Sequence, residues 1–479
     1  MVGPNMFGES MSQRYFKSVY NPQPSEMERP VIPARENTHI TTSGMWQPGR
    51  RRGALQMVPC LGFSRSAPKK NDTYPTGPWL MAGLSAPIEE QNMIEYAYVD
   101  TEDGFSLKAI YDGLPLEGGR VQSPSLMLFF APTPQRGLAQ YADHARRLGH
   151  LKAPEHIPDP ALNHRKTLVT WGIQLEEELE RRKNGEKDVR ARDLLTTDLA
   201  LNNLHVLQEL GAPVDCVVSD DKWQEFYGTN TPKSPDWYHF VDILHSLDIL
   251  SVFWVKANDA EGLPDELCIL DAHGRPIASD PTNPEYIECM REQVSHMASP
   301  CGLNADGFKI DFLGQLPHGP GLRWHGKERG HAALYNYLSN FYEAAKQAKP
   351  SSFIQTHVVS PWFAGVLDEV RINDTNYPLE EDNPAKTKSP IRTMGERVRV
   401  TQTLLPDHPI DYDGWPMRDI PTFLRYVRAQ ARLGRETIHF TTSVNGEPLA
   451  EADFQSVAQS FRRAHSIGQR VVTELAIAS

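Results

Sequence analysis

Hydrophobic and polar positions follow two different patterns in the two halves of the chain. From Gly53 to Thr133, short apolar runs are separated by Gly, Pro, Asn and Asp, and no convincing helical pattern interrupts them. The clearest runs are Tyr96–Val99, Leu107–Tyr111 and Ser125–Phe130. Short runs bounded by such turn residues are typical of antiparallel strands. The pattern therefore predicts an antiparallel β domain in this part of the chain.

A second pattern follows a helix predicted at Leu138–Leu148 and a proline-containing linker. Short apolar strands now alternate with longer amphipathic helices. The predicted strands are Thr167–Trp171, Val214–Asp220, Ser251–Val255, Gly307–Phe312, Ser352–His357, Glu369–Ile372, roughly Thr403–Pro406, and Glu436–Thr442. The predicted helices are Arg190–Leu210, Trp237–Leu247, Pro284–Ala298, His331–Gln347, Ile391–Thr401, Ile420–Leu433 and Glu451–His465. The fifth unit lacks a clear helix. A series of close to eight strand–helix units predicts a (β/α)8 TIM barrel, an α/β fold.

These patterns divide the chain into four parts. We expect a polar, poorly ordered segment over residues 1–45, a partial β-sandwich over 46–135, a helix and linker over 136–165, and the barrel over 166–479. Arg50, Arg51 and Arg52 form a small basic cluster, which we interpret as a solvated loop.

The composition narrows the class of protein further. The chain has 479 residues, of which 39% are hydrophobic and 23% charged, and such values are typical of a folded protein. A net charge of −12 argues against a general nucleic-acid binder. No apolar run is long enough to span a bilayer, and no secretory leader is visible, so we expect a cytoplasmic protein without a membrane partner. The 5 cysteines have no paired or zinc-like spacing, which indicates scattered reduced thiols.

The clearest candidate for chemistry is the segment Asp306-Gly-Phe-Lys-Ile-Asp311. Barrel enzymes carry their sites at the carboxyl ends of the strands, and this predicted strand ends in an acidic residue. With a strand period of two, Lys309 and Asp311 share one face, while Phe308 and Ile310 share the other. Burying both charges is costly unless they pair or meet a polar ligand. We expect them to point into the barrel; an ion pair without catalytic duty is the alternative.

Two further strand ends carry carboxylates. Asp220 and Asp221 follow an apolar strand and precede Trp223, which suggests two acceptors for sugar hydroxyls beside an aromatic wall. Arg371 lies in another predicted strand, Glu369–Ile372. Asp374 follows that strand, so its carboxylate must act from the loop. For all three carboxylates, a helix cap or a local turn is the alternative interpretation.

The remaining strand ends add aromatic, amide and charged residues. They are Trp171 and Gln174, Trp254 and Lys256, Gln355 and His357, Asn373, and Trp415 with Asp411 and Asp413. Each alone is weak evidence, but together they describe a pocket suited to stacking and hydrogen-bonding a polyhydroxylated ring. The spacing of His318, His325 and His331 does not fit a closed metal site, so we interpret them as loop residues and predict no metal.

Two carboxylates at different strand ends suggest glycoside cleavage. One attacks the anomeric carbon, and the other protonates the leaving oxygen and later activates water. Asp311 and Asp374 are the candidates for this pair, and they are expected to converge across the barrel mouth. Lys309 is expected to lower the pKa of Asp311 and keep it ionised.

These segments resemble the clan D α-glycosidases, which are glycoside hydrolase families 27, 31 and 36. Asp306–Asp311 is similar to their Lys-x-Asp nucleophile strand, and Val217–Gln224 resembles the Asp-Asp-Gly-Trp-Gln segment of family 36 α-galactosidases and raffinose synthases. Thr170–Gln174 is similar to their first barrel strand, and Asp280–Glu285 to the segment that opens the helix before the nucleophile strand. Residues 53–133 resemble the tail of the β-sandwich that precedes the barrel in family 36.

The resemblance implies that Asp311 is the nucleophile and that Asp374, accompanied by Arg371, is the acid/base. Together with the strand-end candidates, the expected substrate-binding residues are Asp220, Asp221, Lys309, Trp171, Arg371, Trp254, Lys256, His357 and Trp415. Ile310 and Lys222 depart from the family 36 pattern, which usually has an aromatic residue and Gly at these positions. The predicted barrel extends almost to residue 479, so we do not expect the usual C-terminal β domain of that family within these residues.

The sequence therefore predicts a retaining, α-galactosidase-like glycosidase that forms a covalent glycosyl-aspartate. Its partner is expected to be an α-linked oligosaccharide or glycoside, with no cofactor and no nucleic acid. Two alternatives stay open. One is an α-glucosidase or a raffinose-synthase-like transglycosylase on the same barrel, and the other is a catalytically silent carbohydrate-binding or truncated relative.

Overall fold

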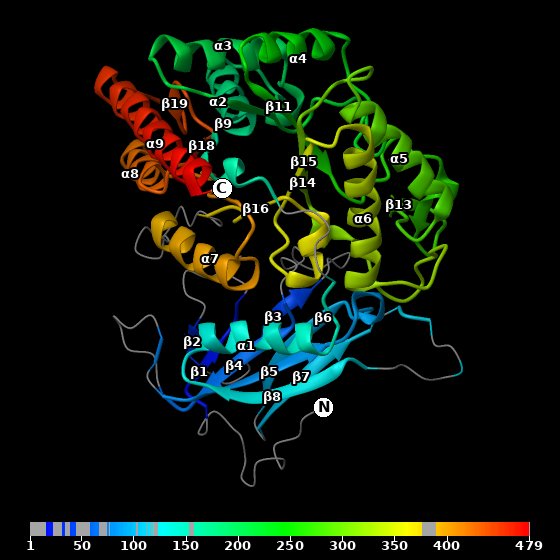
Figure 1. Cartoon of the computed structure of the whole chain (residues 1–479). Helices are drawn as coiled ribbons and strands as arrows, with labels where there is room; N and C mark the ends of the chain where they lie inside the picture. The colour runs from blue at the N-terminus through cyan, green and yellow to red at the C-terminus, as the bar shows by residue number, and fades with distance from the viewer. Residues whose placement is uncertain are drawn as a thin grey trace.

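The computed structural model combines antiparallel sheets in the first part of the chain with a barrel of parallel strands in the second (Figure 1). It describes residues 16–22, 31–33, 39–44, 58–66, 74–75, 77–101, 104–111, 113–115, 118, 123–152, 158–375 and 389–478. The basic cluster Arg50–Arg52 lies outside these residues.

Two antiparallel sheets form the N-terminal domain. The strand order is β2-β1-β4-β5-β8 in one sheet and β3-β6-β7 in the other. The strands are β1 (Ser18–Tyr20), β2 (Val31–Pro33), β3 (His39–Gly44), β4 (Cys60–Ser64), β5 (Trp79–Ser85), β6 (Glu95–Thr101), β7 (Gly104–Ile110) and β8 (Ser125–Ala131). The predicted antiparallel β domain is confirmed. Strands β1 to β3 lie where the pattern predicted a poorly ordered segment. β1 pairs with β4, β3 pairs with β6, and β2 pairs with β1, and local sequence does not reveal these pairings.

Strand β5 is buried on both faces and holds this domain together. Leu80 packs in the core between the two sheets, whereas Met81 belongs to the core beneath helix α1 (Pro134–Arg147). Gly83 lies on the same face as Met81, and a Cβ there would come within 2.5 Å of the Tyr141 ring of α1. The helix therefore packs directly on the sheet, and glycine permits this close approach.

Eight parallel strands form the barrel, in the order β17-β16-β15-β14-β11-β10-β9-β18. They are β9 (Lys166–Val169), β10 (Cys216–Ser219), β11 (Leu250–Lys256), β14 (Gly307–Asp311), β15 (Phe353–Thr356), β16 (Glu369–Arg371), β17 (Ile410–Asp411) and β18 (Glu436–Ile438). The helices around them are α2 (Thr170–Lys183), α3 (Thr197–Glu209), α4 (Asp236–Ser246), α5 (Pro284–Ala298), α6 (Gly330–Ala348), α7 (Pro390–Leu404), α8 (Ile420–Ala431) and α9 (Glu451–Ala478). The predicted (β/α)8 barrel is confirmed.

Two elements of the barrel differ from the prediction. The prediction of a strand at Thr403–Pro406 is wrong, because α7 continues to Leu404 and buries the Leu404 side chain in the core. The seventh strand is instead the two-residue β17, which is too short to give a periodic pattern. Helix α2 was not predicted; it begins at Thr170, where the first strand was expected to continue, and its many charged residues obscure an apolar face. The fifth unit has only the short 3-10 helix η8 (Pro361–Val366), in agreement with the absence of a clear helical pattern.

The β domain packs against the barrel through α1 and the segment between β5 and β6. Trp362 in η8 donates its indole N–H to the carbonyl oxygen of Ala86 at 2.9 Å, and the backbone N–H of Arg329 bonds the side chain of Asn92 at 2.8 Å. All 5 cysteines are free thiols. In the part of the chain that the structure describes, no helix has both the length and the apolar character needed to cross a membrane.

Candidate active site

A cavity of about 360 Å³ opens at the carboxyl ends of the barrel strands. The predicted site residues that line it are Trp171, Asp220, Asp221, Trp254, Lys309, Asp311, His357, Arg371, Asp374 and Trp415. Lys256 is not among the lining residues. Its ammonium pairs with Asp259 at 2.6 Å and lies 4.5 Å from the centre of the Tyr227 ring, so the structure places Lys256 beside the cavity and not in its lining.

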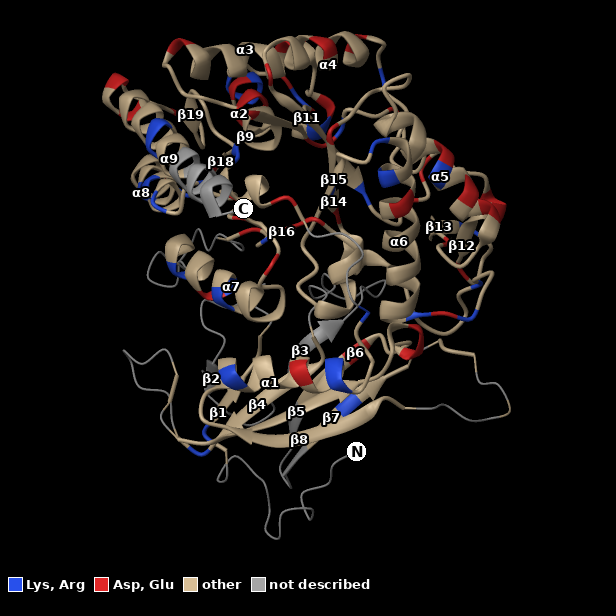
Figure 2. Ribbon diagram, viewed as in Figure 1, with Lys and Arg blue, Asp and Glu red and all other residues tan. Residues whose placement is uncertain are grey.

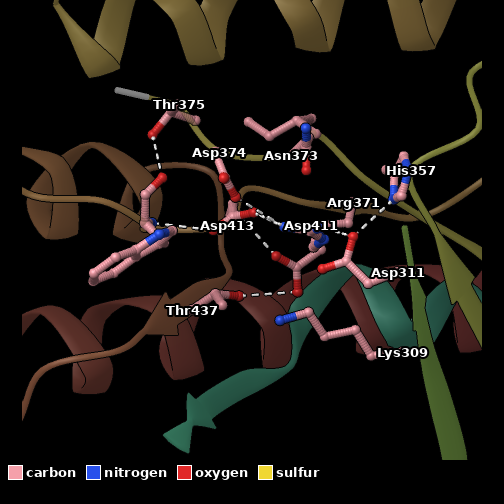
Figure 3. Close-up of polar contacts among 12 residues, drawn as sticks. Lys309, Asp311, His357, Arg371, Asn373, Asp374, Thr375, Asp411, Asp413 and Thr437 are labelled. Carbon is pink, nitrogen blue, oxygen red and sulfur yellow. Dashed lines mark hydrogen bonds and ion pairs between the residues drawn. The ribbon is translucent and has the colours of Figure 1, made fainter. Parts of the chain in front are cut away.

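Asp311 lies at the end of strand β14, and four groups contact its carboxylate, of which Figure 3 labels Arg371 and His357. Its Oδ1 is 3.1 Å from Nη2 of Arg371 and 3.4 Å from Nδ1 of His357, and it accepts the backbone N–H of Phe312 at 2.8 Å. Its Oδ2 is 3.4 Å from the indole nitrogen of Trp254. Burial is the largest single effect and would raise the pKa of Asp311, but the charges of Arg371, His357 and Lys309 and the backbone N–H of Phe312 together outweigh it and hold the pKa well below the usual range. Asp311 is therefore ionised at neutral pH.

Lys309 pairs with a different carboxylate from the one we expected. Its ammonium is 2.6 Å from Oδ2 of Asp220, and both side chains are buried. Arg371, rather than Lys309, is thus the main cationic neighbour of Asp311. Trp223 also differs from the expectation: it is fully buried and donates its indole N–H to the carbonyl of Trp254 at 2.7 Å, so it supports the strand and forms no wall of the cavity.

Asp374 lies in the loop after β16 and shares a guanidinium with two other carboxylates. Nη1 of Arg371 is 3.4 Å from Oδ1 of Asp374 and 2.6 Å from Oδ2 of Asp413, while Nη2 contacts Asp311. Burial raises the pKa of Asp374, and the charge of Asp413 raises it further, against the opposing effect of Arg371. The two candidate catalytic carboxylates therefore have pKa values displaced in opposite directions.

Arg397 of α7 holds the backbone of the loop that carries Asp374. This buried side chain donates from one nitrogen to the carbonyl oxygens of Ile372, Asn373 and Asp374, at 2.7, 2.7 and 2.8 Å. Three consecutive carbonyls are thus held by one cation, which fixes the backbone from which the Asp374 carboxylate extends.

Sequence reasoning missed His439, and it named Asp413 only as one of several strand-end residues of a sugar pocket. His439 directly follows β18, and its Nε2 is 3.4 Å from Oδ1 of Asp413. The predicted strand extended to Thr442, so His439 was expected within the strand and not at its end. A predicted strand that ended at Ile438 would have made His439 a strand-end candidate. Helix α2 packs closely against His439 at Gly172. A Cβ at this position would be 2.2 Å from the carbonyl oxygen of His439, so glycine is needed there. Other lining residues are Leu175, Phe312, Gly314, Gln315 and Asn373.

Three of the strand-end candidates have structural roles outside the cavity. Asp411 is 2.6 Å from Nη2 of the fully buried Arg435, and Gln355 donates to both Asp411 and Glu369 at 3.2 and 2.7 Å. Gln174 is buried and bonded to neighbouring backbone carbonyls. These contacts satisfy buried polar groups beside and beneath the cavity.

Asp221 is expected to make stability depend on pH. It accepts the Tyr227 hydroxyl at 2.6 Å, and burial raises its pKa from 3.8 to about 6. Because the folded form holds this proton more tightly than the unfolded form, the stabilising contribution is complete below pH 3.8 and is lost as the pH rises through about 6. Asp221→Asn should therefore gain in melting temperature relative to wild type between about pH 4 and pH 7.

Thermal unfolding across this pH range measures the effect. Asp242→Asn, which removes an exposed carboxylate from α4, is the matched control. A difference between Asp221→Asn and wild type that stays constant with pH would contradict the raised pKa.

Comparison with known proteins gives no match to a family model and none to a curated sequence. Solved structures do match. The alpha-galactosidase TtGalA from Thermus thermophilus, in complex with p-nitrophenyl alpha-D-galactopyranoside, is 15% identical with a TM-score of 0.59, covering 94% of this chain and 87% of that one. A cycloalternan-degrading enzyme from Trueperella pyogenes, in complex with a covalent intermediate, is 13% identical with a TM-score of 0.58, covering 96% and 64%. The same enzyme in complex with isomaltose is 13% identical with a TM-score of 0.56, covering 96% and 66%.

At this level of identity the likeness establishes the fold. The chain has an α/β barrel preceded by an antiparallel β domain, an architecture that it shares with these two carbohydrate-active enzymes. It spans less than two thirds of the length of the cycloalternan-degrading enzyme in complex with a covalent intermediate.

Proposed function

We propose that the protein is a retaining α-glycosidase, with Asp311 as nucleophile and Asp374 as acid/base. The observation that carries this proposal is that Asp311 and Asp374 lie on the two Nη atoms of one buried guanidinium, Arg371, at the mouth of the barrel. Their surroundings displace the two pKa values in opposite directions. The pKa of Asp311 lies well below its usual range, whereas that of Asp374 lies above it. Carboxyl groups whose environments push their pKa values apart are suited to act as base or nucleophile and as acid.

The reaction then proceeds in two displacements at the anomeric carbon. A carboxylate oxygen of Asp311 attacks this carbon while Asp374 gives its proton to the glycosidic oxygen, and the alcohol leaves. Asp374, now ionised, takes a proton from water, and the resulting hydroxide displaces Asp311 from the sugar. Arg371 contacts both carboxylates and balances their charge through both steps.

One guanidinium contacts both carboxylates, which supports their acting on one bond. Asp311 and Asp374 lie on the two Nη atoms of Arg371 at 3.1 and 3.4 Å. Retaining glycosidases need about 5–5.5 Å between the carboxyl groups, and inverting ones about 6.5–9.5 Å. Both kinds of enzyme need one ionised carboxylate, and Asp311 meets this need; retention is proposed because the segment Asp306–Asp311 resembles the nucleophile strand of the clan D α-glycosidases.

The walls of the cavity suit a single sugar ring. Trp171 and Trp415 offer partly exposed aromatic surface, whereas Trp254 is buried and points its indole nitrogen toward Asp311. The buried pair Lys309–Asp220 offers a donor and an acceptor to hydroxyl groups. An α-galactoside is the first candidate, because the Asp-Asp segment resembles that of α-galactosidases and because the matched Thermus enzyme is in complex with an aryl α-galactoside. An α-glucoside is the second, since another matched structure contains isomaltose.

A panel of aryl α-glycosides, followed by NMR of the first-formed product, tests the proposal. We expect hydrolysis of the p-nitrophenyl α-galactoside with release of the α-anomer. Preference for the α-glucoside would support the second candidate, and transfer to an added sugar in place of water would indicate a transglycosylase. A β-anomer as the first product would contradict retention.

Asp374→Ala should slow glycosides with poor leaving groups by about 10²–10⁴-fold, because their oxygen must be protonated as the bond breaks. Aryl glycosides with strongly acidic phenols need little protonation and should lose far less in the first step. The ratio of kcat/KM for the two substrate types, in the variant and in wild type, measures this. Asp407→Ala, which removes an exposed carboxylate before β17, is the control. Equal losses for both substrate types would argue against an acid role.

A further inference from the structure

A groove of about 470 Å³ lies between α8 and α9, on the outside of the barrel. It shares no lining residue with the cavity of the candidate active site. Its lining residues are Arg428, Ala431, Arg432, Ser456, Gln459, Ser460, Arg462, Arg463 and Ser466. Figure 2 shows blue segments on α8 and α9 where the two helices lie side by side, and red at the N-terminal end of α9. We call this feature the arginine groove.

The helical register brings these side chains to one place. Arg428 lies on α8, and Arg432 follows as its C-cap residue with helical backbone angles; the two are four residues apart, so they share one face. Ser456, Ser460 and Arg463 recur at helical spacing on α9 and form the facing surface. Ser460 is buried, with 5% of its surface exposed, whereas the arginines are exposed. The groove thus has cationic rims and a polar floor.

The arginines have no counter-charge within the described part of the chain. None of the four is within 4.0 Å of a carboxylate there. Arg428 is held by Ser456, to which it donates from Nε at 3.2 Å and from Nη2 at 2.9 Å. Arg462 donates to the carbonyl of Leu210 at 3.1 Å. No hydrogen bond or ion pair joins the guanidinium group of Arg432 or Arg463 to another described residue, although the backbone N–H of Arg432 bonds the carbonyl oxygen of Gln430. Like charges gathered in this way repel one another, in a chain whose net charge is −12.

We propose that the arginine groove binds a small molecule through a phosphate group. Guanidinium groups bind phosphate oxygens in a bidentate way, and serine hydroxyls are good donors to the remaining oxygens. A concave surface lined by one sign of charge concentrates the opposite charge from solution. The volume lies within the range of about 300–1,000 Å³ seen for small-molecule sites. Inorganic pyrophosphate, a sugar phosphate and a nucleoside triphosphate all carry the group that this site recognises.

Isothermal titration calorimetry of the full chain at about 0.15 M salt tests the proposal with these three phosphate compounds as separate probes. We expect saturable one-to-one binding of at least one, and comparison of their affinities identifies the source of the phosphate. The variant carrying both Arg432→Gln and Arg463→Gln should bind at least about tenfold more weakly.

Arg425→Gln is the matched control, because Arg425 is an exposed arginine of α8 that does not line the groove and donates to Thr422 at 3.2 Å. It should keep the wild-type affinity. The double variant should also keep the wild-type rate on an aryl α-glycoside, since neither arginine lies in the active-site cavity. No saturable binding of any probe, or equal affinity in wild type and the double variant, would overturn the proposal. An equal loss of affinity in Arg425→Gln would also overturn the proposal, because it would indicate that binding depends on diffuse positive charge and not on the arginine groove.

Discussion

Asp311→Asn is expected to lower kcat on an aryl α-glycoside by more than about 10⁴-fold, while the melting temperature stays within a few degrees of that of wild type. An amide has the shape of the carboxylate but cannot form the glycosyl ester from which water later releases the sugar. The fold should survive because Arg371 keeps two other carboxylate neighbours, Asp374 and Asp413. Steady-state kinetics and thermal unfolding of the purified variant measure both effects.

A second variant and a control separate chemistry from structure. Asp311→Gly leaves room for azide, which should restore turnover of an activated glycoside by forming a glycosyl azide of inverted configuration. Asp306→Asn is the matched control, since Asp306 begins the same segment but pairs with Lys349 at 2.6 Å and is not a lining residue of the cavity. It should retain activity even if it loses some stability. Wild-type-like hydrolysis by Asp311→Asn would contradict a nucleophilic role.

Arg371→Gln should have the second large effect, on stability and on pH dependence together. Removing the guanidinium leaves Asp311, Asp374 and Asp413 near one another without their shared cation, and breaking a buried ionic network in this way costs about 3–5 kcal/mol. The pKa of Asp311 should rise once the cation is lost, so the acid limb of the kcat/KM profile should move to higher pH. Urea unfolding and a pH–rate profile measure the two effects.

Arg371→Lys keeps the prediction testable if the Gln variant does not fold. Lysine retains the charge but is unable to bridge several carboxylates with a fixed fork, so intermediate losses of stability and rate are expected. Arg399→Gln removes an exposed arginine of α7 that pairs only with Glu396 among the ion pairs of the described residues, and it serves as the control. Unchanged stability together with an unmoved acid limb would contradict the central position of Arg371.

Local sequence determined much of the fold. Helix α5 coincides with its predicted range, Pro284–Ala298, because Asn283 caps it and proline occupies its first position. The strand period correctly placed Lys309 and Asp311 on the face that lines the cavity. Where elements were missed, the local signal was weak: β17 has two residues and takes its conformation from pairing with β16.

The electrostatic pairing in the site was beyond prediction from the sequence. Lys309 pairs with Asp220, which is 89 residues away in the chain, rather than with Asp311 on its own strand. Arg371 contacts carboxylates from three different strand ends, and only the folded barrel brings these together. His439 reaches the carboxylate of Asp413 in the same site. Helix α2 can pack against His439 because it carries Gly172 there, where a Cβ would collide with the His439 backbone. Such contacts depend on barrel geometry and not on local periodicity.

Trapping the covalent intermediate tests the proposed function most directly. The full chain is incubated with a fluorinated α-glycosyl fluoride that reacts quickly in the first step and slowly in the second, and is then digested for peptide mass spectrometry. We predict a mass increase of one glycosyl group on Asp311, and none in Asp311→Asn. Turnover of aryl α-glycosides with no adduct, or with an adduct on another residue, would contradict the assignment of Asp311 as the nucleophile.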